Sequence, residues 1–100
     1  MENHYTFRHM DATEAIKEHA QNASVKLEKF VKPTVNANWI FLVEAGEHKA
    51  ELRVKGPHVD YFVEARTPNL YHSIDEAVNK MEKQLKKHKE ILKNHLHRDR

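Results

Sequence analysis

Residues 48–66 read HKAELRVKGPHVDYFVEAR and contain two runs in which apolar and polar side chains alternate. Such alternation is typical of β-strands with one buried face, and Gly56-Pro57 between the runs predicts a turn. We expect strands over about 48–55 and 58–66. Because each has only one apolar face, any helices must cover the same side of the sheet. The predicted inward-facing residues are Ala50, Leu52, Val54, Val59, Tyr61, Val63 and Ala65.

Two further strands are expected nearer the N-terminus. Residues 36–44 are apolar on both sides in their middle and end at the turn residues 45–47. Residues 3–8 alternate, with Tyr5 and Phe7 on one side. In the second strand, the residues expected to face the helices are Trp39, Phe41 and Val43, and those expected on the open side are Ile40 and Leu42.

A helix is predicted between the first two strands. Either Asp11 or Thr13 can cap it, and Asp11 with Glu14 three residues later resembles a capping box. We expect this helix to run to about Lys32, because Pro33 cannot continue it. Its predicted buried stripe consists of Ile16, Ala20, Ala23, Leu27 and Phe30.

A longer helical pattern follows the last strand, from Tyr71 to about His97, with Asn69 as its N-cap. Its predicted apolar stripe consists of Tyr71, Ile74, Val78, Met81, Leu85 and Leu92. The predicted fold is therefore α+β, a β-α-β-β-β-α two-layer sandwich with two helices packed on one face of a four-stranded sheet. We expect a single domain over 1–96 and a short flexible tail over 97–100.

The composition excludes several classes of protein. One hundred residues suffice for one core, and the absence of cysteine excludes disulfides and thiolate zinc sites. The longest apolar run, residues 39–43, is too short to span a membrane, and the first residues do not resemble a signal peptide. We expect a soluble cytoplasmic protein with no membrane partner.

The side chains that could perform chemistry lack the spacing that chemistry requires. Nine histidines are present, but no His-Glu-x-x-His or comparable ligand motif occurs, so we predict no metal site. Ser24 and Ser73 lie within the predicted helices, without a nucleophile elbow. Two glycines cannot form a glycine-rich phosphate loop. We predict no catalytic residues, no cofactor and no enzymatic activity.

Charge is distributed unevenly along the chain. Residues 77–98 hold seven Lys/Arg against two acids, whereas residues 1–67 hold nine against ten. A basic helix on a neutral body favours a polyanionic partner. A solvated surface remains an alternative, because Glu76–Lys80 and Glu82–Lys86 have the i,i+4 spacing of ordinary helix ion pairs.

The lysines of the long helix form two rows at helical spacing. The first row is Lys80, Lys83 and Lys87, and the second is Lys86, Lys89 and Lys93. The first helix adds further cations, and Arg8 ends the first strand. If the helices lie side by side, these outer faces merge into one basic surface that positions the protein on phosphates without reading sequence. The first-helix cations are Lys17, Lys26, Lys29 and Lys32.

Three segments together resemble the ribosome hibernation promoting factor family, formerly called sigma-54 modulation proteins. They are Thr13-Glu14-Ala15-Ile16 followed by Lys26-Leu27-Glu28, then Leu70-Tyr71-x-x-Ile74-Asp75, then Lys80-Met81-x-Lys83-Gln84-Leu85-x-Lys87-His88-Lys89. The resemblance covers almost the whole chain and implies the same β-α-β-β-β-α fold.

The resemblance implies a function that lysines alone do not. Members of the family bind the small ribosomal subunit between head and body, covering 16S rRNA where mRNA and tRNA would sit, and translation stops by steric exclusion. Short members promote inactive ribosome dimers in stationary phase together with a small ribosome modulation factor. The end of the chain shortly after the second helix resembles that short type. We expect a monomer when free, and no DNA partner.

The family's RNA-facing positions can be matched along this sequence. Two departures from the family pattern concern Ala23, where many members have lysine, and Phe7, which replaces a usual glycine. Together with the lysine rows, the resemblance gives these predicted RNA-binding residues: Arg8, Lys26, Lys29, Lys80, Lys83, Gln84, Lys86, Lys87, His88 and Lys89.

Two other functions remain open from the sequence. A general double-stranded RNA-binding module also packs two helices on one face of an antiparallel sheet, in α-β-β-β-α order, and would bind any long RNA duplex. A protein-interaction domain would instead pair through the open sheet face, at Ile40, Leu42 and Phe62.

Overall fold

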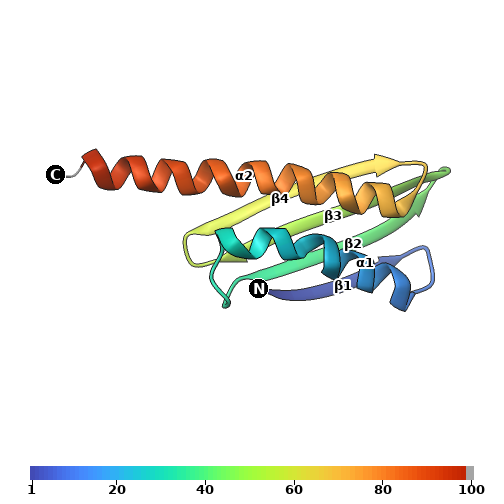
Figure 1. The fold of residues 1–100 in the computed structure, drawn as a ribbon. Helices are drawn as coiled ribbons and strands as arrows, with labels where there is room; N and C mark the ends of the chain where they lie inside the picture. The colour runs from blue at the N-terminus through green and yellow to red at the C-terminus, as the bar shows by residue number, and fades with distance from the viewer. Residues whose placement is uncertain (99–100) are drawn as a thin grey trace.

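The computed structural model describes the backbone of residues 1–98 and the side chains of residues 1–93. A four-stranded sheet forms one layer, and the helices form the other (Figure 1). This arrangement confirms the predicted β-α-β-β-β-α two-layer fold. The elements are β1 (Glu2–Arg8), α1 (Glu14–Ser24), the 3₁₀-helix η1 (Val25–Phe30), β2 (Asn36–Glu44), β3 (Glu47–Gly56), β4 (Val59–Thr67) and α2 (Leu70–Arg98).

The sheet has the order β1-β2-β3-β4 and is mixed. β1 runs parallel to β2, because the chain crosses over the sheet through α1 and η1 between them. The other two pairs are antiparallel and joined by short turns. The turn between β2 and β3 uses Ala45 and Gly46 at positive φ, and His58 takes this conformation between β3 and β4. The sheet is therefore not wholly antiparallel.

The core lies between the sheet and the helices. Trp39 and Phe41 of β2 are almost fully buried and their rings stack with centroids 5.6 Å apart. Phe7 packs against Phe41 at 5.0 Å, so the unusual phenylalanine of β1 fills the core side of the sheet. The predicted inward residues Ala50, Leu52 and Val54 are fully buried. These contacts fix the helix layer on one face, as the alternation predicts.

The first helical segment differs from the prediction. It begins at Thr13, whose Oγ1 accepts a hydrogen bond from the Ile16 amide at 3.2 Å, so Thr13 and not Asp11 is the N-cap. The α-helix ends at Ser24, and η1 continues to Phe30 instead of an α-helix to Lys32. The tighter 3₁₀ winding places Leu27 and Phe30 three residues apart on one side, where Leu27 is fully buried.

The start of α2 is held by the predicted cap. The Asn69 side-chain oxygen accepts hydrogen bonds from the amides of Tyr71 (2.9 Å) and His72 (3.4 Å). One turn later, the buried Ser73 hydroxyl donates to the His48 carbonyl of β3 at 2.6 Å. These bonds attach the first turn of α2 to the sheet.

The buried stripe of α2 was predicted correctly in its middle and wrongly at its ends. Ile74, Val78, Met81 and Leu85 are buried, whereas Tyr71 is 40% and Leu92 is 47% exposed. Leu70 is buried in place of Tyr71, because Leu70 lies four residues before Ile74 on the same face of the helix. At the other end, α2 runs past the sheet (Figure 1), and Leu92 belongs to its C-terminal part.

α2 extends beyond the sheet because it is longer than the strands. Twenty-nine residues of α2 span about 43 Å at 1.5 Å per residue, whereas the ten residues of β3 span about 33 Å. Within the described residues, no helix is long and apolar enough to cross a membrane. Of the predicted tail over 97–100, the first two residues belong to α2 and the last two lie outside the described residues.

A substitution at Gly56 can test the packing between β3 and the segment before β2. A Cβ at this position would lie 2.8 Å from Val35 Cγ2 and 3.3 Å from Val35 Cα. We expect Gly56→Ala to lower the free energy of unfolding by about 1–3 kcal/mol through overpacking, measured by urea denaturation. In a Val35→Ala background, Gly56→Ala should lower the free energy of unfolding by a smaller amount, because the Val35 methyl that would clash with the new Cβ is absent. Equal losses in both backgrounds would contradict this contact.

Candidate nucleic-acid interface

The first lysine row lies along the flank of α2 that borders β4. Lys80, Lys83, Gln84 and Lys87 line a shallow open hollow of about 340 Å³. Its floor is Val63 of β4. The structure thus brings together four of the predicted RNA-binding residues on one side of the helix.

Most of these ammonium groups are not neutralised. Lys80 is the exception, because its Nζ donates to the Glu64 carbonyl at 2.8 Å and lies 3.6 Å from Glu76. Among the side chains that the structure describes, the remaining five lysines of the two rows form no salt bridge, and all five are exposed. They are Lys83, Lys86, Lys87, Lys89 and Lys93. Unpaired like charges at helical spacing repel one another, and a bound anion would relieve this repulsion.

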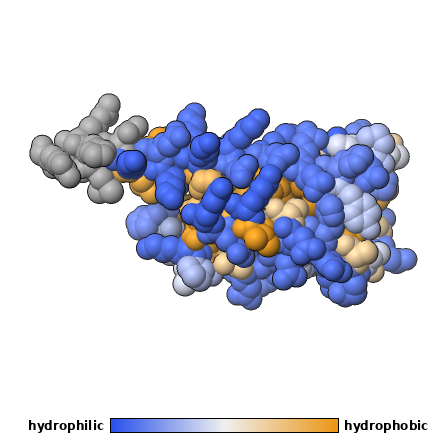
Figure 2. All heavy atoms as spheres, in the orientation of Figure 1, coloured by the Kyte–Doolittle hydropathy of each residue, from blue (hydrophilic) through white to orange (hydrophobic). Residues whose placement is uncertain are grey.

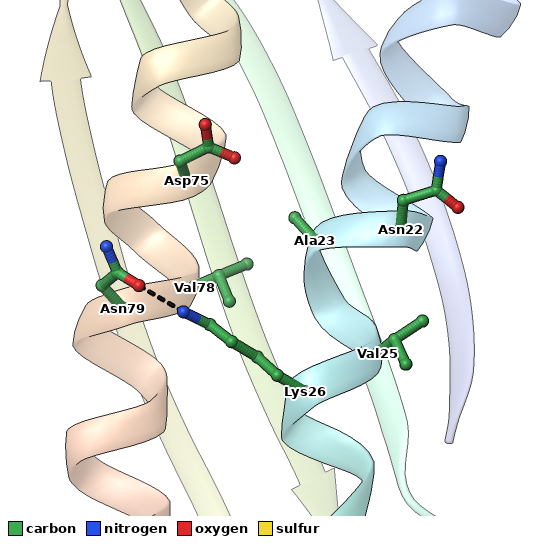
Figure 3. A pocket seen from close by; sticks show the side chains of 7 residues that line it. All are labelled: Asn22, Ala23, Val25, Lys26, Asp75, Val78 and Asn79. Carbon is green, nitrogen blue, oxygen red and sulfur yellow. Dashed lines mark hydrogen bonds between the residues drawn. The ribbon is translucent and has the colours of Figure 1, made fainter.

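The two helices meet along a furrow of about 580 Å³ (Figure 3). Across it, Lys26 donates a hydrogen bond to Asn79 and lies 3.8 Å from Glu82. Nearer the start of α2, His19 contacts Asp75 at 2.8 Å. Lys26 therefore joins the helices, and its charge is partly offset. The predicted merging of the helix surfaces is interrupted here by acidic side chains.

Ala23 lies in the same furrow, between the two helices (Figure 3). Its short side chain leaves this part of the furrow open.

The second lysine row lies on the other flank of α2. Lys86, Lys89 and Lys93 follow Glu82 at helical spacing, and Glu82 faces Lys26 of η1. η1 contributes Lys29, whose Nζ lies 5.2 Å from the centre of the Phe30 ring. η1 thus adds Lys26 and Lys29 to the exposed cations of the helix side.

His88 is held by a partner that sequence reasoning missed. Its Nδ1 lies 2.8 Å from the Tyr61 hydroxyl of β4, and the two rings meet edge to face with centroids 5.4 Å apart. His88 is half-buried. The pair could not be found from spacing, because 27 residues separate its members.

Arg8 lies apart from the α2 lysines. Burial alternates along β1, with Tyr5 and Phe7 toward the core and Arg8 exposed. Its neighbour on β2 is Leu42, which the alternation also places on the open sheet face. Of the ten predicted site residues, nine lie on the helix side and Arg8 lies on the opposite side of the sheet.

The open sheet face has few free cations. Arg53 forms two hydrogen bonds of 2.9 Å with Asp60, which lower the pKa of that carboxyl below its usual value. Lys49 lies 3.1 Å from Glu51 and 3.3 Å from Glu64. Hydrogen bonding to Glu51 is the main cause that raises the pKa of Lys49. On the sheet face, Lys49 and Arg53 thus have carboxylate partners, whereas Lys55 and Arg66 form no salt bridge within the described residues.

The hydrophobic residues predicted for protein pairing are only partly available. Phe62 is 51% exposed, whereas Leu42 is 9% exposed and Ile40 is half-buried. Pairing through this face stays a prediction. By contrast, hydrophilic residues cover most of the helix side, with smaller hydrophobic areas between them (Figure 2).

No cluster of three or more potential metal ligands occurs among the described residues. The geometry instead offers exposed ammonium groups on a rigid helix, which can hold phosphates by charge and hydrogen bonding.

The sequence profile of the family described as sigma 54 modulation protein / S30EA ribosomal protein matches residues 4–93. The chain belongs to this family. A ribosome hibernation promoting factor of Salmonella typhimurium is 29% identical over 97 residues, which cover 95% of this chain and all of the relative. A ribosome hibernation promotion factor of Bacillus subtilis is 32% identical over 84 residues, which cover 80% of this chain but 44% of that protein.

Solved structures of family members have the same fold. The N-terminal domain of Thermus thermophilus Protein Y superposes with a TM-score of 0.79 at 25% identity, over 87% of this chain and 98% of the domain. A ribosomal subunit interface protein from Coxiella burnetii superposes with a TM-score of 0.77 at 22% identity, over 89% of this chain and 98% of that protein. The family consists of ribosome-associated hibernation factors, which are not enzymes, so the prediction of a non-enzymatic protein is confirmed.

The Tyr61–His88 contact can be tested through stability. Tyr61→Phe removes the hydroxyl next to His88 Nδ1 and should lower the free energy of unfolding by about 0.5–1.5 kcal/mol, measured by thermal and urea denaturation. Tyr71→Phe is the matched control, because the Tyr71 hydroxyl has no hydrogen-bond partner among the described side chains. Equal stabilities of the two variants would contradict the role of this contact.

Proposed function

We propose that this protein is a ribosome hibernation factor that binds the small ribosomal subunit in its mRNA and tRNA channel, with α2 against 16S rRNA. Occupation of that space blocks translation by exclusion and requires no reaction. The bound protein promotes inactive ribosome dimers in stationary cells, where a ribosome modulation factor assists. It acts in the cytoplasm and is a monomer when free.

The observation that supports this proposal is the difference between the two faces. The lysines at positions 83, 86, 87, 89 and 93 are exposed without described carboxylate partners, whereas Lys49 and Arg53 of the sheet face have them. A cation that already has a carboxylate partner gains less binding free energy from contact with a phosphate. The helix side is therefore the surface that RNA would select.

Rigidity favours the same role. α2 is capped by Asn69, tied to β3 through Ser73 and tied to η1 through Lys26. These hydrogen bonds fix the backbone of α2, so binding of phosphates orders the lysine side chains without also having to order the helix. The names of the relatives, ribosome hibernation promoting factor, support the ribosome as the partner.

Charge reversal tests the assigned face. We expect Lys83→Glu/Lys87→Glu to weaken binding to purified small subunits by about twentyfold or more at 0.15 M salt, because each lost phosphate contact forfeits the release of nearly one counterion. Co-sedimentation through sucrose measures the affinity. Circular dichroism should remain unchanged, since both lysines are exposed.

A matched control changes the same charge on the other face. Lys55→Glu/Arg66→Glu alters two exposed cations of β3 and β4 on the open side. The small-subunit affinity of this variant should stay within about threefold of the unmodified protein, since only long-range electrostatics change. A larger loss in this variant than in the α2 variant would assign RNA binding to the sheet face.

Salt dependence tests the number of phosphate contacts. If about six phosphates are neutralised, the logarithm of the affinity should fall with the logarithm of salt concentration at a slope of about −4. Lys83→Gln/Lys87→Gln should make this slope shallower by about 1.4. A slope near zero for the unmodified protein would exclude phosphate binding as the main interaction.

A further inference from the structure

An apolar groove of about 380 Å³ lies between the C-terminal half of α2 and the segment that joins η1 to β2. The turn between β3 and β4 closes one end. Its lining residues are Phe30, Val31, Lys32, Val35, Pro57, His58, Val59, His88 and Leu92. None of these described lining residues is acidic. The groove therefore combines apolar walls with cationic and imidazole groups.

The groove exists because α2 leaves the sheet. Leu85 is the last core residue of the helix, at 1% exposure, and the same stripe continues through His88 and Leu92. Beyond the turn between β3 and β4, α2 continues with no strand beneath it (Figure 1). Leu92 is therefore 47% exposed on the helix side that would otherwise be buried. An occupant could cover this surface without displacing any core residue.

The walls are positioned before anything binds. The His88 ring is held by Tyr61 through the 2.8 Å contact and the edge-to-face packing. On the facing wall, Phe30 packs against the core, with Lys29 over its ring at 5.2 Å. The Phe30 and His88 rings thus line the groove together with aliphatic side chains such as Leu92.

The charges around the groove decide what kind of occupant fits. His88 lies between Lys87 and Lys89 in sequence, and both lysines are exposed. Lys32 of the lining adds a cation on the opposite wall. A nucleotide matches this arrangement, because its base is flat and weakly polar while its phosphates are anionic.

We infer that this groove receives one unstacked base of ribosomal RNA, with its flanking phosphates on the lysines of α2 and η1. Unstacked bases of single-stranded segments bind proteins by inserting next to ring and aliphatic side chains. The groove thus adds a non-ionic contact to a surface that otherwise holds only phosphates. The base site rests on the proposed function, since it deepens how the helix side holds RNA.

Adjacent residues of α2 provide a matched pair of variants. Leu92 and Ile91 are both exposed aliphatic residues, at 47% and 55%, and only Leu92 lines the groove. We expect Leu92→Ala to weaken binding to purified small subunits by about fivefold, because part of one apolar wall is lost. Ile91→Ala should bind within twofold of the unmodified protein. The salt slope should stay the same in both variants, since no charge changes.

Chemical probing identifies what occupies the groove. With small subunits saturated by protein, probing with dimethyl sulfate and a carbodiimide, which together modify all four bases, should show at least one rRNA base protected by the unmodified protein and by Ile91→Ala but reactive with Leu92→Ala. Equal affinities of the two variants would overturn the base site. A loss confined to Leu92→Ala without any change in base reactivity would also overturn it, because the groove would then bind a ribosomal protein.

These outcomes are separate from those of the proposed function. If the unmodified protein does not bind small subunits at all, the proposed function fails together with the base site. If it binds with the expected salt slope and Leu92→Ala behaves like Ile91→Ala, the phosphate surface stands and only the base site fails.

Discussion

Burial of one apolar face of the sheet is the constraint on which the remaining structure depends. Trp39, Phe41 and Leu52 can leave water only if both helices cover the same side. The helices then lie next to each other and expose their outer faces in the same direction. A basic surface on α2 is therefore a consequence of how the core is closed, combined with the lysines that occupy the outward positions.

The same constraint explains why the surface has two distinct parts. Where α2 lies over the sheet, it has a neighbour on one flank, and Lys26 connects to Asn79 and Glu82 there. Where α2 runs beyond the sheet, its core-facing stripe continues without a strand, and Leu92 is left partly exposed. Charge dominates the first region, and an apolar groove with a cationic rim forms at the second.

The two faces differ more clearly in whether their cations have carboxylate partners than in how many cations they carry. On the sheet face, cross-strand neighbours bring carboxylates to Lys49 and Arg53. On α2, the two glutamates of its basic half lie among more numerous lysines, and Glu82 faces Lys26 of η1. Unpaired cations thus accumulate on one side of a domain whose total charge is only +2.

The sequence by itself determined the order of elements, the buried faces of β3 and β4, and the lysine rows, because these depend on periodicity within single segments. Tertiary structure alone decided that Arg8 lies on the opposite face, that Lys26 is tied to α2, and that His88 meets Tyr61. These contacts join segments far apart in the chain, and their geometry depends on the direction of β1 and the length of α2. The helical pattern predicted the length of α2 closely, but local patterns carry no information about the direction of β1 or about which distant residues meet.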